Sequence, residues 1–286
     1  MNKHFLNFGR VMQCANIHRL IKKTDLNNSV RVMYSHEVKR DDFHNFETVI
    51  KYLNQISSIL NPKEFFYYLE SNKYFTGKNV MFTFDDGLLS SYHFAKEILN
   101  KYNIKAIFFV PTAILKLSSK NEMRHFVKNN IYFGSNNSMS LTDDEYKVMN
   151  KKHLLELAND GHLIFPHTHN HLFISDIIDK AMVDKELVKP KIIIEDITGE
   201  KLNVFAFPVG TENQVSKYAY KNIRDHYEFC FTALSGLITK NTDHYKLYRT
   251  HLPANAPLSY INMIMRGVYD PYYRLKMNKL SQITDG

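Results

Sequence analysis

The sequence of 286 residues contains no tryptophan, only two cysteines and no long uninterrupted run of apolar residues. A membrane-spanning helix needs about 20 consecutive apolar residues, so the sequence predicts no transmembrane segment. Cys14 and Cys230 lie far apart and match no zinc-binding or redox spacing, which argues against a disulfide framework and against a thiolate metal site. We expect both cysteines to be buried free thiols.

The first 20 residues do not resemble a secretory signal. Basic residues are present, but Asn7, Arg10, Gln13 and His18 interrupt the apolar side chains, so the apolar central region of such a signal is missing. The sequence therefore predicts a cytoplasmic location.

Basic residues outnumber acidic ones, with 37 Lys and Arg against 29 Asp and Glu and a formal net charge of +8. The lysines are spread along the chain without a dense basic run, and no RNA- or DNA-binding signature is present. We therefore expect solvated charged faces and no nucleic-acid partner. The positive charge is compatible with a phosphorylated glycan carrier or with peripheral contact to a membrane surface.

The order of apolar and amphipathic stretches predicts an α/β fold. Short apolar runs rich in Val, Ile and Phe recur between amphipathic stretches, which is typical of β-α units and of a mostly parallel sheet or barrel. Residues 78–84, 92–102 and 106–110 form the clearest strand, helix and strand unit. The chain length and an apolar content of 44% predict one domain over residues 1–286. Further strands are expected at residues 30–34, 163–165, 204–207, 229–233 and 248–251, and further helices at 46–60, 62–69, 141–149, 151–159 and 180–198.

Two adjacent carboxylates, Asp85 and Asp86, follow the predicted strand at residues 78–84 and precede Gly87. They repel each other, and their desolvation at the end of a strand is costly unless a cation neutralises at least one. A bound metal ion would meet this need. The alternative is a plain turn, in which the Asp side chains bond to nearby backbone and Gly87 supplies a positive φ.

Three histidines, His167, His169 and His171, lie within five residues. The spacing of His167 and His171 puts both rings on one side of a helical turn, whereas His167 and His169 would share a face only in a strand. Two imidazoles and one carboxylate suit zinc, iron, cobalt or nickel and leave positions open for water and substrate, which predicts a catalytic metal. The alternative is three surface histidines in a loop.

The order of these two motifs resembles the polysaccharide deacetylase (NodB-homology) family, whose members share a T-F-D-D-G strand end and a later H-[ST]-x-x-H. Both motifs are present here, at residues 83–87 and 167–171. The resemblance extends over about residues 31–253, in which residues 115–150 form a longer link than the family core needs. The supporting stretches are VMYSHEV at 32–38, YHFAKEILNKYNIKAIFFV at 92–110, HLLELANDGHLIFPHTHNH at 153–171 and FAFPVG at 205–210.

The resemblance implies a distorted, seven-stranded (β/α) barrel with its active site at the carboxyl ends of the strands. Carried over by position, it implies that Asp85 is the general base and that Asp86, His167 and His171 bind one divalent metal ion. Zinc is the expected ion, with cobalt, nickel and iron as alternatives. His169 would be a bystander or would support a ligand from behind.

The third motif of the family shows two departures in this sequence. The resemblance implies that Pro208, Val209 and Gly210 bind substrate. The family usually has arginine where Ala206 stands and tyrosine where Val209 stands. The arginine that orients the base and the tyrosine whose backbone helps to bind the oxyanion are therefore unmatched.

Arg249 and His251 are expected to complete the site, because the stretch at residues 248–252 is the candidate for the last motif of the family. Residues two apart on a strand share a face, so Arg249 would hold Asp85 through two parallel hydrogen bonds while His251 points into the same pocket as the acid. The alternatives are an exposed Arg249 and a partly exposed structural His251. An aromatic wall would have to consist of Tyr or Phe, since the chain has no tryptophan.

The predicted function is that of a metal-dependent hydrolase, which removes an N-acetyl or other acyl group from an amino sugar of a glycan or glycan precursor. The expected location favours a substrate linked to a lipid or to a nucleotide. Two alternatives stay open: a hydrolase of small amides, imides or formamides, and a catalytically silent glycan-binding protein that keeps the metal site. The link at residues 115–150 predicts either a functional lid or a surface excursion packed on its own aromatics.

Overall fold

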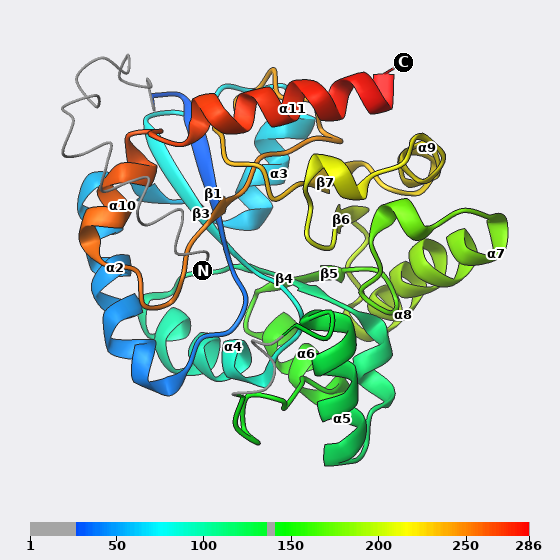
Figure 1. Ribbon diagram of the computed structural model, residues 1–286. Helices are drawn as coiled ribbons and strands as arrows, with labels where there is room; N and C mark the ends of the chain where they lie inside the picture. The colour runs from blue at the N-terminus through cyan, green and yellow to red at the C-terminus, as the bar shows by residue number, and fades with distance from the viewer. Residues whose placement is uncertain (1–26, 136–140, 286) are drawn as a thin grey trace.

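Parallel strands surrounded by helices form the structure, a computed structural model that describes residues 27–135 and 141–285 (Figure 1). The larger sheet has the order β5-β4-β3-β1-β8, with β2 beside β3, and all its pairings are parallel. A smaller sheet pairs β6 with β7, also in parallel. The strands are β1 (Ser29–Ser35), β2 (Ser58–Ile59), β3 (Lys78–Phe84), β4 (Ile107–Val110), β5 (Leu163–Pro166), β6 (Val204–Ala206), β7 (Phe229–Phe231) and β8 (Thr250–His251).

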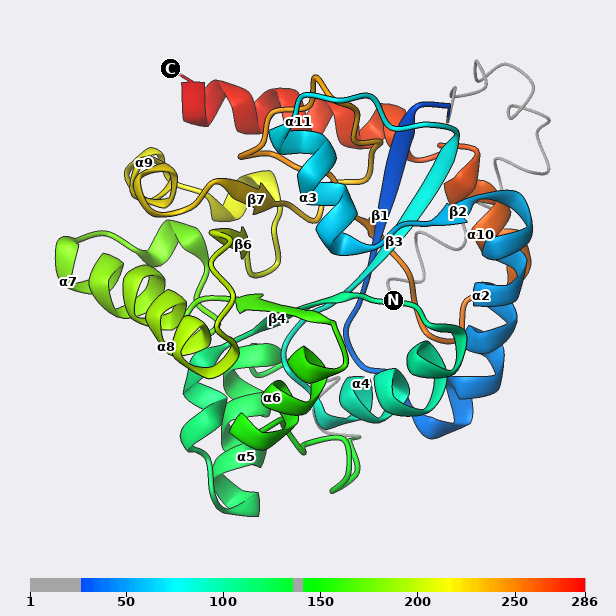
Figure 2. The same cartoon turned by 180° about the vertical axis from the view of Figure 1, so that it is seen from behind.

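Helices connect most successive strands and cover the outside of the sheets, as Figures 1 and 2 show from opposite sides. Side chains that cap the first turn start several of them, among them Asn61 before α3 and Asn150 before α6. The α-helices are α2 (Phe43–Ile56), α3 (Pro62–Glu70), α4 (Leu89–Phe94), α5 (Lys120–Phe126), α6 (Lys151–Asn159), α7 (Lys180–Val183), α8 (Lys189–Thr198), α9 (Lys217–His226), α10 (Leu258–Met265) and α11 (Asp270–Asp285). Single π turns at Ala95–Leu99, Val127–Ile131 and Asp184–Val188 extend α4, extend α5 and join α7 to α8. Short 3-10 turns lie at Arg40–Asp42, Asn100–Tyr102, Thr112–Lys116, Ile174–Asp176 and Glu212–Gln214.

Side chains of both sheets meet in one interior core. Successive residues of a strand point to opposite faces, so Val32 of β1 lies in the interior cluster while Met33 packs under the outer helices. Phe109 of β4, Phe165 of β5 and Phe231 of β7 join Val32 in the interior. Burial of both strand faces explains the nearly continuous apolar runs in the sequence.

The strands are arranged like those of a barrel, but strand pairing does not continue all the way round it in the described part of the chain. After β7, the backbone N–H of Thr232 donates to the carbonyl of Leu247, and the N–H of Arg249 donates to the carbonyl of Leu234. These hydrogen bonds connect the segment after β7 to the segment before β8, and β8 in turn pairs with β1. β5 packs beside β6, but no strand pairing joins them in the described part of the chain. The α/β class is thus confirmed, and the expected barrel is distorted at this β5–β6 seam.

Most predicted strands and helices are present near their expected bounds, but the predicted helix at residues 141–149 is wrong. The described segment forms turns and a short antiparallel bridge between Val148 and Leu88. The backbone N–H of Met149 also donates to the carbonyl of Gly87. Pairing with the segment that follows β3 therefore outweighs the local helical pattern, as tertiary context commonly does.

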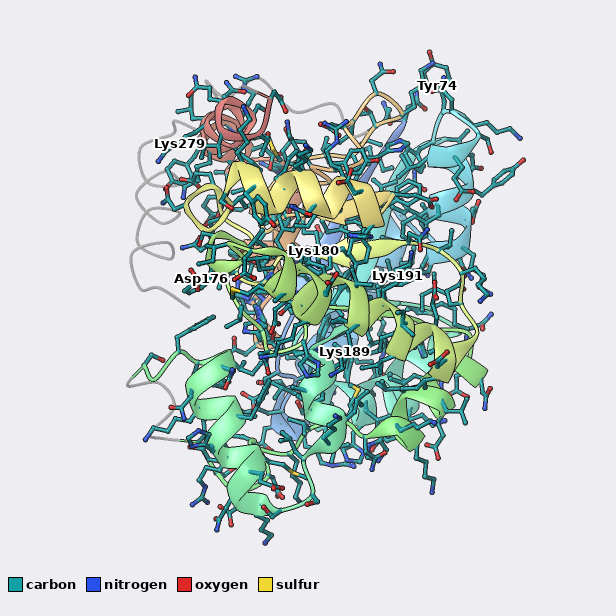
Figure 3. All side chains as sticks on the ribbon, turned by 90° about the vertical axis from the view of Figure 1, so that its right-hand side faces the viewer. Tyr74, Asp176, Lys180, Lys189, Lys191 and Lys279 are labelled. Atoms are coloured by element: carbon teal, nitrogen blue, oxygen red, sulfur yellow. The ribbon has the colours of Figure 1, made fainter. Side chains whose placement is uncertain are left out.

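The outer helices present charged side chains at the surface. Figure 3 looks onto α8 and α9, and the labelled side chains of Lys180, Lys189 and Lys191 lie on this face. Within residues 27–135 and 141–285, no helix combines the length and the apolar character that a membrane crossing requires. In the interior, Cys230 is a buried free thiol as expected, whereas Cys14 lies outside the described residues.

A buried arginine anchors the last helix to β1. Arg31 is 1% exposed, and its guanidinium forms two hydrogen bonds to Asp270 at the start of α11, at 3.0 and 2.7 Å. Nη1 of Arg31 also donates to Oγ1 of Thr250 in β8 at 3.0 Å. A buried guanidinium needs such partners, because its desolvation is not otherwise compensated.

Replacing Asp270 with alanine should destabilise the protein by about 3–5 kcal/mol, because Arg31 would keep a buried charge without its carboxylate. Urea unfolding followed by circular dichroism would measure the change. Lys180→Ala is the matched control, since the exposed ion pair of Lys180 with Asp184 should contribute only about 0.3–0.5 kcal/mol. Equal stability of Asp270→Ala and wild-type protein would contradict the anchoring role of the ion pair.

Candidate active site

Asp86, His167 and His171 converge at the carboxyl ends of β3 and β5. One ligand atom from each lies within 4.8 Å of the others, and all three side chains are buried. Nε2 of His171 lies 3.2 Å, and Nε2 of His167 lies 3.8 Å, from Oδ1 of Asp86. The ligand atoms of a tetrahedral zinc ion lie roughly 3.3 Å apart, given metal–ligand distances of about 2.0–2.1 Å. The three residues that the sequence predicts as ligands are thus brought together at a spacing that suits one metal ion.

The two imidazoles turn lone pairs toward Asp86. Nδ1 of His167 lies 2.8 Å from the carbonyl oxygen of Ala206, and Nδ1 of His171 lies 2.7 Å from that of Asn130. A carbonyl only accepts hydrogen bonds, so Nδ1 carries the proton in each ring, and Nε2 of the neutral ring keeps its lone pair. Oδ1 of Asp86 is buried without a hydrogen-bond partner among the described residues. Three lone pairs that face one point fit a cation.

The pKa shifts of Asp86 and His171 indicate the same need for a positive charge between the three side chains. Burial alone would raise the pKa of Asp86, but the imidazoles of His36, His171 and His167 lower it below its ordinary value. Burial would lower the pKa of His171, but the carboxylate of Asp86 raises it above its ordinary value, and only the protonated ring can donate across the 3.2 Å contact. Burial lowers the pKa of His167 to about 4, so this ring is neutral at pH 7. A metal ion would replace the proton on His171.

Unusual backbone conformations turn the three side chains toward one another. Asp86, Thr168 and His171 have positive φ angles of 72°, 58° and 59°. For a β-branched residue such as Thr168 this conformation is strained, and it persists only where surrounding contacts enforce it. The predicted helical turn is therefore wrong: reversals of the backbone at Thr168 and His171 bring the rings of His167 and His171 to a centroid separation of 5.0 Å.

A buried carboxylate holds the loop that carries these histidines. Glu186, in the π turn Asp184–Val188, is 1% exposed and accepts hydrogen bonds from the backbone N–H groups of His169 (3.0 Å) and Asn170 (2.8 Å). His169 bonds through Nδ1 to Thr112 at 2.8 Å and is not part of the triad. Sequence analysis missed Glu186, because a single glutamate in a helix gives no local signal of its partners.

Asp85 lies beside the triad and contacts Arg249. Nη1 of Arg249 lies 2.7 Å from Oδ1 of Asp85 and 3.3 Å from Oγ1 of Thr83. The contact agrees with the expectation, and an exposure of 1% excludes the alternative of a solvent-facing Arg249. The expected pair of parallel hydrogen bonds is wrong, because Nε of Arg249 donates to the carbonyl of Thr232 at 2.9 Å and only Nη1 reaches the carboxylate.

Aromatic rings and two further imidazoles surround Arg249. Its guanidinium carbon lies 4.8 Å from the ring centroid of Tyr34 and 5.2 Å from that of Phe109, so tyrosine and phenylalanine line this part of the site. The ring of His251 lies 5.1 Å from that of Tyr34 and 5.7 Å from that of His36, and burial lowers the pKa of His251. Sequence analysis missed His36, although its position just after an apolar strand was the available signal.

Part of the long link at residues 115–150 belongs to this site. Asn130 of the link supplies the carbonyl that orients His171. Phe133 stacks on Phe173 with ring centroids 4.5 Å apart, and its ring lies 5.5 Å from that of His171. The link is therefore not a surface excursion packed only on its own aromatics, because it contacts a candidate metal ligand. Its role as a lid stays a prediction.

The turn after β6 carries the predicted substrate-binding residues Pro208, Val209 and Gly210. Val209 is 39% exposed and has a φ of 59°, a strained value for a β-branched side chain. Gly210 lies so close to Ala233 that a Cβ on Gly210 would meet the backbone nitrogen of Ala233 at 2.5 Å. Ala206 serves the site through its carbonyl, although its side chain cannot replace the arginine of the family. Substrate binding by this turn stays a prediction.

Replacing Glu186 with alanine should lower the free energy of unfolding by about 2–4 kcal/mol, because the buried N–H groups of His169 and Asn170 would lose a charged acceptor. Denaturant unfolding would measure the loss. Asp196→Ala, an exposed change on α8, is the control and should stay within about 0.5 kcal/mol of wild type. If the two variants were equally stable, Glu186 would not hold the histidine loop.

Comparisons of the sequence with known proteins show which family it matches. A sequence model described as polysaccharide deacetylase matches residues 72–224. The YxkH protein of Bacillus subtilis (strain 168), which is named for the same family, is 24% identical over 208 residues. The aligned part covers 72% of this chain and 63% of YxkH, so the chain spans less than two thirds of the length of this relative.

Solved structures share the fold at low sequence identity. The Streptococcus pyogenes deacetylase PplD in complex with acetate has a TM-score of 0.63 and 18% identity, and the match covers 83% of this chain and 99% of PplD. IcaB from Ammonifex degensii has a TM-score of 0.62 and 20% identity, with coverage of 83% and 96%. These similarities show the fold, while the family match extends over more than half of the sequence. The chain therefore belongs to the polysaccharide deacetylase family.

Proposed function

We propose that the protein hydrolyses the N-acetyl or another acyl group of an amino sugar in a glycan or glycan precursor, with one divalent metal ion. The observation that carries this proposal is the buried triad of Asp86, His167 and His171 with Asp85 beside it. Membership of the polysaccharide deacetylase family supports deacetylation of a glycan. Zinc is the ion that this donor set favours, with cobalt, nickel and iron as alternatives.

The donor set of the triad fits a resident metal ion. Oδ1 of Asp86 is buried and lacks a hydrogen-bond partner among the described residues, and backbone carbonyls fix the proton of each imidazole on Nδ1. Three protein ligands leave at least one coordination position open, as in catalytic sites. When bound, the ion lowers the pKa of a coordinated water molecule and polarises the acyl oxygen.

In this proposal Asp85 accepts the proton of the attacking water. Arg249 binds Oδ1 of Asp85, whereas Oδ2 lies 4.0 Å from Nε2 of His167 on the side of the triad. The guanidinium holds the carboxylate through one charge-assisted hydrogen bond to Oδ1, which orients the group that would act as the general base. This arrangement supports an active enzyme over a silent glycan-binding protein, because a silent site does not need an oriented base.

The leaving amine needs a proton, and we assign its delivery to the imidazole pair of His36 and His251. Their rings lie 5.7 Å apart, and His36 is close enough to Asp86 to lower the pKa of that carboxyl. Burial lowers the pKa of His251, which makes this ring by itself a poor carrier of a proton near neutral pH. A shared role for the two rings therefore replaces the sequence-based assignment to His251 alone.

Removing one imidazole ligand should remove metal and activity together. His171→Ala should lose bound metal, measured by elemental analysis, and should release no acetate from a panel of N-acetylated saccharides, because two ligands hold the ion too weakly. His169→Ala is the matched control, since His169 lies in the same loop but outside the triad. Full metal occupancy in His171→Ala would remove the basis of the proposed metal site.

Replacing Asp85 should impair catalysis without impairing metal binding. Asp85→Asn should keep the metal and the fold but lose about two or more orders of magnitude in turnover, because the amide cannot accept the proton of water. Arg249→Ala should also lower turnover, while Asp196→Asn, an exposed change on α8, should not. Full activity of Asp85→Asn would require another base, and unchanged turnover of Arg249→Ala would favour the silent alternative.

A further inference from the structure

The last helix, α11, contacts the chain that follows β6. In Figure 1, α11 runs from the side of α10 toward α9, and it contacts α9 and the 3-10 turn Glu212–Gln214. This 3-10 turn comes shortly after residues 208–210, which the sequence predicts to bind substrate and which we refer to as the Val209 turn. The helix lies outside residues 72–224 of the family match, so that match does not account for this contact.

A buried carboxylate joins the 3-10 turn to α11. The side chain of Glu212 is 6% exposed, and Nζ of Lys276 lies 3.2 Å from its Oε1 and 3.3 Å from its Oε2. Three residues further along the helix, Nζ of Lys279 donates to Oδ1 of Asn213 at 2.9 Å. A buried carboxylate needs a compensating cation, so the position of Glu212 depends on Lys276.

The Val209 turn needs support from its surroundings because its backbone is strained. Val209 has a φ of 59°, a value that a β-branched residue keeps only where neighbouring contacts enforce it. On one side, the carbonyl of Gly210 accepts a hydrogen bond from the N–H of Ala233 at 2.8 Å. On the other side, the chain continues into the 3-10 turn, where the ion pair of Glu212 with Lys276 supplies a second fixed point.

The backbone just before the Val209 turn has hydrogen bonds of its own. The carbonyl of Ala206 binds Nδ1 of His167 at 2.8 Å, and the N–H of Phe207 donates to the carbonyl of Phe231 at 3.0 Å. These contacts do not involve α11. A shift of the Val209 turn should therefore change substrate binding while the candidate metal ligands stay in place.

Two further ion pairs hold the two ends of α11. Arg31 binds Asp270 at the start of the helix, with hydrogen bonds of 3.0 and 2.7 Å. Nζ of Lys246 binds both oxygens of Asp285 at the other end, at 2.6 and 2.8 Å. A helix that is fixed at both ends presents the side chains of its middle part at a defined place, and the middle part of α11 reaches the 3-10 turn.

We propose that Glu212 and Lys276 are positioning residues, through which α11 holds the Val209 turn in the conformation that binds substrate. This inference rests on the proposed function and deepens it, because it gives the last helix a part in substrate binding. Neither residue has to touch the substrate or the metal ion for this role.

Amide hydrogen exchange of the full chain tests whether α11 holds the turn. Lys276→Met removes the cation and keeps a side chain of similar length. Asp285→Asn is the matched control, because it breaks the ion pair with Lys246 on the same helix. Mass spectrometry of peptides that contain residues 208–214 should show exchange about tenfold or more faster in Lys276→Met, and less than about twofold faster in Asp285→Asn.

Steady-state kinetics on the panel of N-acetylated saccharides separate positioning from a general loss of structure. Lys276→Met should raise KM about five- to tenfold and keep kcat within about twofold, which is the pattern for lost binding without a lost reaction step. Bound metal should be unchanged, because the contacts of His167 do not involve α11. Lys276→Arg keeps the positive charge and should keep KM within about twofold of wild type.

Four results would overturn the proposal: equal exchange of residues 208–214 in wild type and Lys276→Met, an equal rise of KM in Asp285→Asn, an equal rise of KM in Lys276→Arg, or loss of metal from Lys276→Met. The second result would assign α11 a general structural role. If the wild-type protein releases no acetate from any saccharide of the panel, the proposed function fails, while hydrogen exchange still decides whether α11 holds the turn.

Discussion

The site depends on two carboxylates that stand side by side in a buried position. Asp85 and Asp86 are each 3% exposed, and two neighbouring carboxylates cannot both stay ionised there without compensating charge. The fold gives each its own partner: the guanidinium of Arg249 for Asp85, and the imidazoles of His167 and His171 for Asp86. Two adjacent residues of the same type thus have different surroundings, which suits the different roles that we propose for them.

Parallel pairing of β1 with β3 brings together the segments that follow these two strands, including the one that carries Asp85 and Asp86. The register aligns Ser35 with Phe84 at the ends of the two strands, so the segments that carry Glu37 and Asp85 leave the sheet next to each other. At the β5–β6 seam, where strand pairing is missing in the described chain, the side chain of His167 bonds to the backbone of Ala206. A candidate metal ligand is therefore also a structural connection between the two sheets.

The long link at residues 115–150 contributes contacts to the candidate active site. The backbone carbonyl of Asn130 orients His171, and the ring of Phe133, three residues later, lies 5.5 Å from the ring of His171. Insertions in surface connections are tolerated, and they commonly carry function because a rigid scaffold positions them. The segment that the sequence predicts to be an insertion therefore contributes contacts to a candidate metal ligand.

Local sequence was sufficient for the strands, for the adjacent carboxylates and for the clustered histidines, because strand burial and motif spacing are properties of short segments. The position of Arg249 in the candidate for the family's last motif led to the expected contact with Asp85, which the structure shows. Local sequence failed for the conformation between His167 and His171, where positive φ angles replace the expected helical turn. Tertiary structure alone decided the partners of the ligands, because any residue can offer a backbone carbonyl as Asn130 does, and long-range packing selects which one comes within reach.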